Sequence, residues 1–124
     1  MKIKEITIAG KQVTLAYCFA TEISFKTLTD CDLNPFMVES VETLGADKMP
    51  DVKKRLCAIL AAAIAYADSK NEESPIDDKL LMNEADPEEF NEAFGVVIGL
   101  WMQFYHIPTG EPQEKKQKGR ARKN

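Results

Sequence analysis

The run of twelve residues from Leu56 to Ala67 is apolar throughout and contains six alanines, and it constrains the fold more than any other part of the chain. A helix over this run has no side that it can show to water, so other elements must surround it. The run is too short for a membrane span, which needs roughly 18 residues. We therefore predict a central helix that begins at Met49-Pro50-Asp51, and we expect Leu60→Asp to unfold the domain.

The N-terminal segment predicts a β-hairpin over residues 3–17. Apolar and polar residues alternate on both sides of Gly10-Lys11, which is the pattern of two half-buried strands joined by a tight turn. The alternating apolar positions are Ile6, Ile8, Val13, Leu15 and Tyr17. A hairpin alone is marginal in water, so its apolar face is expected to pack on the helices that follow.

Two helices are predicted between the hairpin and the central helix. Thr21 can cap a short helix that runs to Thr29. Asn34 can cap a second helix, with proline following at its first position, and Gly45 can end it.

A polar loop over 68–78 and one helical turn over 79–82 are predicted to lead to a last helix over 87–105. Asp86 can cap this helix, and proline and two glutamates fill its first turn, where the helix dipole favours negative charge. Its apolar stripe comprises Phe90, Phe94, Val97, Trp101 and Phe104. This stripe carries more apolar surface than the other elements are expected to cover, so we expect the protein to form homo-oligomers.

Gly95 and Gly99 lie four residues apart on the predicted last helix and therefore share one of its faces. Because glycine has no side chain, another helix could approach this face closely. The alanine-rich helix is the expected neighbour, which predicts a helix-packing role for the two glycines. A contact with another molecule through the same face is the alternative.

The charge of the chain changes sign near its C-terminal end. Residues 1–105 hold 10 Lys and Arg against 18 Asp and Glu, whereas residues 106–124 hold 6 against 2. The basic segment has no apolar periodicity and is predicted to be a disordered tail after a single domain over 1–105. Together these patterns predict an α+β fold that is mainly helical, with the hairpin packed on a bundle of about four helices.

No catalytic constellation is visible. His106 is the single histidine, and the three cysteines match no metal-binding or redox spacing, so we expect neither an enzyme nor a metal or cofactor site. Odd, scattered cysteines and the lack of a signal-peptide core favour a cytoplasmic protein without membrane insertion. Trp101, Phe104 and Tyr105 cluster before the basic tail and are the predicted partner-binding residues, although core packing explains Trp101 equally well.

The order of elements resembles the small tail assembly chaperones of long-tailed bacteriophages and prophages. The hairpin Ile6–Leu15, the following segment Ala20–Lys26 and three later helices carry the resemblance, which covers about residues 3–105. It implies a non-enzymatic protein of the bacterial host cytosol that coats the tape measure protein and keeps it soluble during tail assembly. The family offers no fixed catalytic or ligand motif, so the predicted site remains the aromatic cluster.

A small cytosolic protein-interaction domain or a nucleic-acid-associated regulator is the alternative. The regulator would use the basic tail to contact phosphates, and its binding would weaken steeply with salt. The acidic body argues against nucleic acid as the partner.

Overall fold

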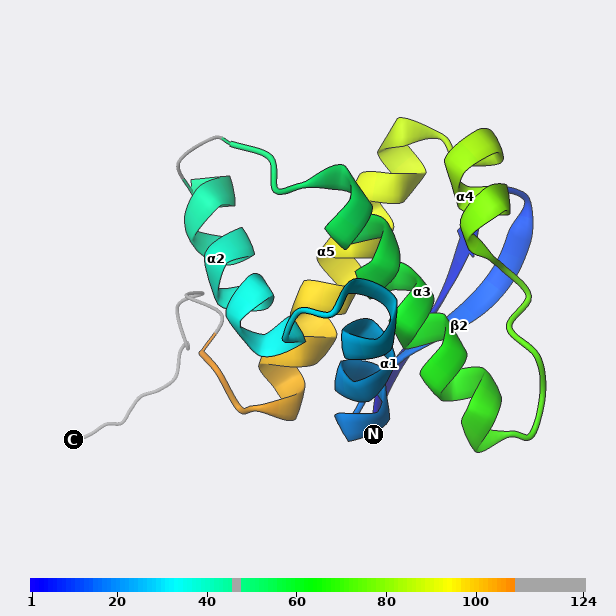
Figure 1. The fold of residues 1–124 in the computed structure, drawn as a ribbon, viewed down its shortest axis with the longest axis horizontal. Coiled ribbons are helices and arrows are strands. Elements are labelled where there is room, and N and C mark those ends of the chain that lie inside the picture. The colour runs from blue at the N-terminus through cyan, green and yellow to red at the C-terminus, as the bar shows by residue number, and fades with distance from the viewer. Residues whose placement is uncertain (46–47, 109–124) are drawn as a thin grey trace.

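The computed structural model describes residues 1–45 and 48–108. This part of the chain forms a two-stranded antiparallel sheet followed by five helices (Figure 1). The elements are β1 (Lys2–Ile8), β2 (Lys11–Tyr17), α1 (Phe19–Thr29), α2 (Leu33–Gly45), α3 (Val52–Ser69), α4 (Asp78–Glu84) and α5 (Pro87–Phe104). The predicted α+β, mainly helical fold is confirmed.

The alanine-rich helix α3 lies at the centre of the molecule. Asp51 caps it by accepting a hydrogen bond from the backbone N–H of Lys54 at 3.3 Å. Ten of the twelve residues from Leu56 to Ala67 are buried, and α1, β2, α4 and α5 all contact the helix. The prediction of a surrounded central helix is confirmed.

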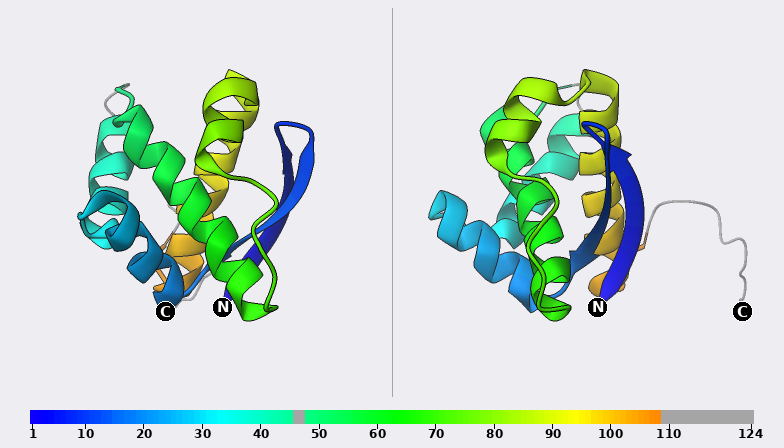
Figure 2. Two further views of the ribbon diagram at one scale, coloured as in Figure 1. Left: turned by 45° about the vertical axis from the view of Figure 1, so that its right-hand side comes forward. Right: turned by 90° about the vertical axis from the view of Figure 1, so that its right-hand side faces the viewer.

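The hairpin stands along one side of α5, and α1 projects from the other side of the molecule (Figure 2). The register of the two strands of the hairpin runs from Lys2 opposite Tyr17 to Ile8 opposite Lys11. The turn between the strands places Ala9 and Gly10 at positive φ, which glycine adopts without strain. The N–H of Ala9 donates to Oε1 of Glu89 at 3.1 Å, so the turn is tied to the first turn of α5.

Two helices begin earlier than the sequence predicts. Helix α1 begins at Phe19 with Cys18 as its N-cap, so Thr21 is its third residue. The buried hydroxyl of Thr21 accepts from the N–H of Cys18 at 3.2 Å and donates to the carbonyl of Ala16 at 2.8 Å. Helix α2 begins at Leu33, since the side chain of Asn34 accepts a hydrogen bond from Trp101.

Helix α5 has the predicted cap, because the carboxylate of Asp86 accepts from the N–H groups of Glu88 and Glu89. Its apolar stripe is covered. The buried residues are Phe90, Ala93, Phe94, Val97, Leu100 and Trp101. The expectation that this helix leaves an excess of uncovered apolar surface is therefore wrong, since β1, β2, α2 and α3 pack against it.

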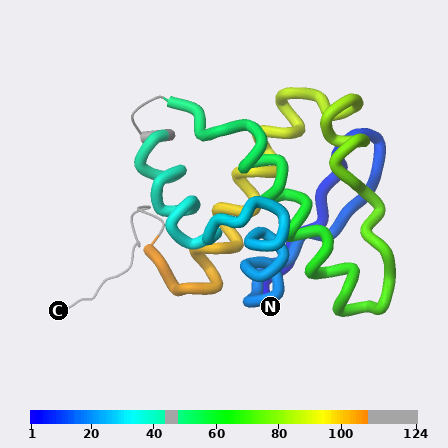
Figure 3. The backbone as a smooth tube through the Cα atoms, viewed as in Figure 1, coloured from blue at the N-terminus to red at the C-terminus, as the bar shows by residue number. Residues whose placement is uncertain are grey.

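The C-terminal end of α5 returns to the beginning of the chain (Figure 3). The ring of Phe104 lies 5.4 Å from that of Tyr17 and 5.2 Å from that of Phe19. The packed body continues past the predicted boundary at residue 105, because the N–H of Ile107 donates to Met102 and its side chain packs against the core. Most of the predicted tail, from residue 109 onward, lies outside the described residues.

Candidate binding site

Trp101 belongs to the core. Its side chain is buried, and its Nε1–H donates to Oδ1 of Asn34 at 2.6 Å, which fixes α5 against the start of α2. A buried indole with a satisfied N–H has little surface to offer a partner. Of the two interpretations that the sequence allows for Trp101, core packing is the one that the burial supports.

Phe104 and Tyr105 lie together at the end of α5, next to the start of α1. Their rings are 5.0 Å apart, and the edge of one faces the other. Phe104 is half-buried against Tyr17 and Phe19, whereas Tyr105 is 37% exposed. The structure therefore brings two of the three predicted binding residues to the surface.

A carboxylate holds this aromatic cluster together. Oε2 of Glu22 accepts hydrogen bonds from the hydroxyls of Tyr17 at 2.8 Å and Tyr105 at 2.5 Å. Donation to Glu22 raises the pKa of Tyr105 to about 12, and burial together with the bond to Glu22 raises the pKa of Tyr17. Both hydroxyls stay protonated near neutral pH, so the carboxylate joins α1 to the end of α5 there.

Two exposed apolar residues beside this cluster were not predicted. Phe19 and Ile23 lie one turn apart on α1 and are 64% and 67% exposed. Because the predicted helix began at residue 21, Phe19 lay outside it and the shared face was not recognised. Their spacing of four residues would have indicated that both lie on one face of a helix.

Gly95 and Gly99 do not pack against the alanine-rich helix. No described atom outside their own helical surroundings lies within 4 Å of the position that a Cβ would take at either glycine. The two residues sit off the buried stripe of α5, and Gly95 is exposed. The predicted helix-packing role is wrong, because α3 meets the stripe of large side chains instead.

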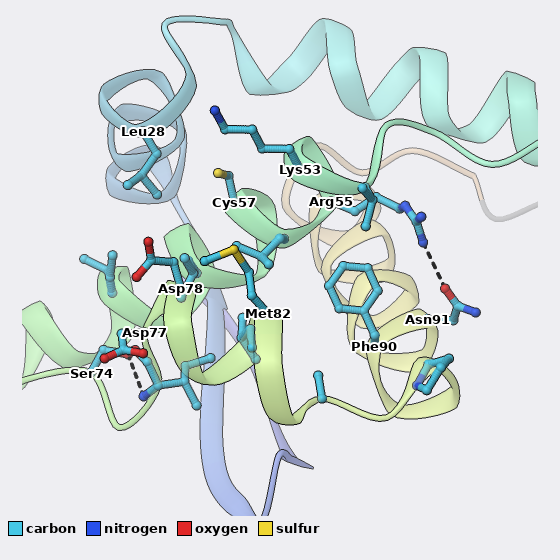
Figure 4. Close-up of a pocket in the computed structure, with 18 of the residues that line it drawn as sticks. Leu28, Lys53, Arg55, Cys57, Ser74, Asp77, Asp78, Met82, Phe90 and Asn91 are labelled. Carbon is cyan, nitrogen blue, oxygen red and sulfur yellow. Dashed lines mark hydrogen bonds between the residues drawn. The ribbon is translucent and has the colours of Figure 1, made fainter.

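An apolar groove of about 1140 Å³ runs along α3 between α1, α4 and the start of α5 (Figure 4). Its floor consists of buried side chains: Leu56, Leu60, Ile76, Leu81 and Phe90. Four apolar side chains at its mouth are 40% to 62% exposed: Leu28, Met49, Val52 and Met82. Exposed apolar side chains that gather in one place mark a binding surface.

Sequence analysis did not find this groove because its walls come from four helices and the segments that connect them. Leu28 lies in the last turn of α1, Met49 precedes α3, and Met82 lies on α4. Nothing in the local sequence around each of these residues distinguishes it from other residues of its helix or loop. Only the tertiary fold brings them together.

Carboxylates gather at one end of the groove. Glu73, Asp77 and Asp78 come from the segment that follows the end of α3, and Figure 4 shows Asp77 and Asp78 opposite Arg55, which lies beside Phe90 and Asn91. Lys53 points toward Leu28, on the same side of that view as Asp78. The groove therefore has an acidic end, whereas its two cations are separated from each other.

Arg55 connects α3 to α5. Its Nε–H donates to the carbonyl of Pro50 and its Nη1 to Oδ1 of Asn91, both at 3.0 Å, and its guanidinium carbon lies 5.2 Å from the ring centroid of Phe90. Burial lowers the pKa of Arg55, but an arginine keeps its charge in proteins. These contacts hold the start of α3 against the first turns of α5.

The groove offers apolar contact rather than reactive groups. Burial raises the pKa of the Cys57 thiol, so it remains protonated and is a poor nucleophile. Within residues 1–45 and 48–108, no three His, Cys, Asp or Glu side chains are grouped as metal ligands. None of the helices in the described part of the chain combines the length and hydropathy that crossing a membrane requires.

No protein-family model, curated protein or solved structure matches the chain. The function therefore has to be inferred from the surfaces described above and from the order of the elements.

Proposed function

We propose that this protein is a non-enzymatic tail assembly chaperone of a long-tailed bacteriophage or prophage. In the bacterial host cytosol it would bind apolar segments of the tape measure protein and keep that protein soluble until the tail assembles around it. The resemblance in the order of hairpin and helices supports this assignment. The apolar groove along α3 is the observation that carries it.

A chaperone of this kind needs apolar surface that is exposed in the free protein and covered in the complex. Leu28, Met49, Val52 and Met82 provide such a surface at the mouth of the groove. The two methionines add flexible side chains that adapt to different apolar partners. Burial of this surface stabilises a complex by about 25 cal/mol for each Å² removed from water.

Coexpression with the tape measure protein tests the proposal. The client is taken from the gene cluster that encodes this chain, and its soluble fraction is measured with and without the chaperone. We expect the chaperone to keep the client soluble. A double variant, Val52→Gln with Met82→Gln, is expected to lose this effect because both substitutions place polar groups at the mouth of the groove.

The matched control is Ile3→Gln, which makes the same kind of change at a residue of β1 that is 52% exposed and lies outside the groove. This control should retain full activity. If the wild-type protein leaves the client insoluble, the proposed function is wrong.

We also expect self-association, through the exposed face of α1 rather than through α5. Phe19 and Ile23 present adjacent apolar side chains there, next to the cluster formed by Phe104 and Tyr105. Light scattering should show dimers or larger species as the concentration rises. The double variant Phe19→Ser with Ile23→Ser should shift the mass toward the monomer, and a wild-type monomer from micromolar to millimolar concentration would contradict this prediction.

A further inference from the structure

We infer that the groove binds an amphipathic helix of about three turns, with cationic side chains at the end that lies over Glu73, Asp77 and Asp78. This inference rests on the proposed function, because it names the form of client segment that the chaperone would hold. It also specifies the shape and the charge of the ligand, and both can be tested without the client.

The length of the groove favours a short helix. The lining residues of α3 extend from Val52 to Ile64, which corresponds to about 18 Å at 1.5 Å per residue. A ligand helix of roughly three turns covers the same length. The volume of about 1140 Å³ lies above the 300–1,000 Å³ that is usual for small-molecule sites.

The walls of the groove favour a helix over an extended strand. Helices α1, α3, α4 and α5 line it, together with three short connecting segments. The backbone groups of helices are already bonded within each helix, so they cannot pair with an added strand. A ligand must bind through side chains, and a helix presents these as a stripe at positions i, i+3, i+4 and i+7.

The acidic end selects cationic side chains. Glu73, Asp77 and Asp78 are exposed, and none of them forms an ion pair with another residue in the described part of the chain. Asp77 accepts from the N–H of Leu80 and Asp78 from that of Lys79, through one carboxylate oxygen each. The remaining oxygens are free to accept hydrogen bonds from a lysine or arginine of the ligand.

The other end of the groove requires no charge on the ligand. Arg55 lies there, but it is 8% exposed, and Pro50 and Asn91 already accept hydrogen bonds from its guanidinium. A helix that is cationic at one end and uncharged at the other therefore matches the groove.

Three synthetic peptides of about 18 residues, long enough to be partly helical in water, test the inference. All carry the same stripe of leucine and alanine. The first has lysines at one end, the second has glutamines at the same positions, and the third has glutamates there. Fluorescence anisotropy with the full-length protein should show that the first binds about three- to tenfold more tightly than the others.

A charge reversal at the acidic end gives the decisive comparison. The variant Glu73→Lys with Asp78→Lys leaves the cap residue Asp77 intact, and it should make the glutamate peptide the tightest ligand. The control variant Glu5→Lys with Glu39→Lys makes the same change in net charge at exposed positions outside the groove and should keep the wild-type order.

Equal affinities for the three peptides, or the same change of order in both variants, would overturn the inference. If no peptide binds and the Val52→Gln, Met82→Gln variant becomes monomeric, the occupant of the groove is a second copy of this chain instead. The peptides are not the tape measure protein, so a failure of coexpression together with the expected peptide order would refute the proposed function alone.

Discussion

An aspartate in place of Ile59 is expected to leave the protein unfolded at room temperature. Ile59 is fully buried on α3, the helix that contacts α1, β2, α4 and α5. Loss of the isoleucine contacts costs about 2–5 kcal/mol, and an unpaired buried carboxylate adds several kcal/mol. The total is comparable to the 5–15 kcal/mol that stabilises a typical domain. Circular dichroism during heating measures the outcome.

The conservative variant Ile59→Val provides the control, since it removes one methylene and should cost only about 0.5–1.5 kcal/mol. Leu60→Asp should also unfold the protein, because Leu60 is buried at the floor of the groove. A cooperative melt of Ile59→Asp within a few degrees of the parent would show that α3 is not the centre of the core.

Trp101→Ala is expected to destabilise the protein by about 3–5 kcal/mol, the range found for large aromatic side chains in cores. The substitution leaves a cavity between α5 and α2 and removes the hydrogen bond to Asn34. Trp101→Phe should cost less, because a ring remains and the lost bond contributes about 1 kcal/mol. Urea denaturation monitored by circular dichroism measures both changes.

Phe19→Ala is the matched control for this prediction. It also removes an aromatic side chain, but Phe19 is 64% exposed, so its stability should change by about 0.5 kcal/mol or less. Similar losses for Trp101→Ala and Phe19→Ala would contradict the assignment of Trp101 to the core. That result would restore Trp101 as a candidate partner-binding residue.

The elements that sequence analysis predicted well are those whose own residues determine them. Helix α3 is apolar on every side, and helix α5 combines a capping aspartate, a proline and a regular stripe. The hairpin has strict alternation around a glycine turn. In each case the local pattern and the tertiary environment favour the same structure.

The predicted starts of α1 and α2 lie later than the observed ones, and the two expected capping residues bond distant or buried groups. Thr21 bonds the carbonyl of Ala16, and Asn34 bonds the indole of Trp101, 67 residues away in the chain. A single sequence does not reveal such long-range use of a side chain. The same limit explains Gly95 and Gly99, since their spacing shows that they share a face but not which element faces them.

The candidate site was predictable only in part. Tyr105 was predicted as a partner-binding residue, and it is exposed because it lies beyond the last buried position of α5. The groove depends on the positions of α1 and α4 relative to α3, which local patterns do not determine. In the sequence, the carboxylates of its acidic end also look like unrelated solvated charges.

The bond between Ala9 and Glu89 joins the first turn of the chain to the first turn of its last helix, and this has a consequence for biosynthesis. A ribosome releases the hairpin first, but the helices α3 and α5 that cover it emerge later. The two strands alone are marginally stable, so they remain uncovered while most of the chain is being made. Phe90 of α5 also completes the groove, so a nascent chain acquires its binding surface in one late step, once α5 has left the ribosome.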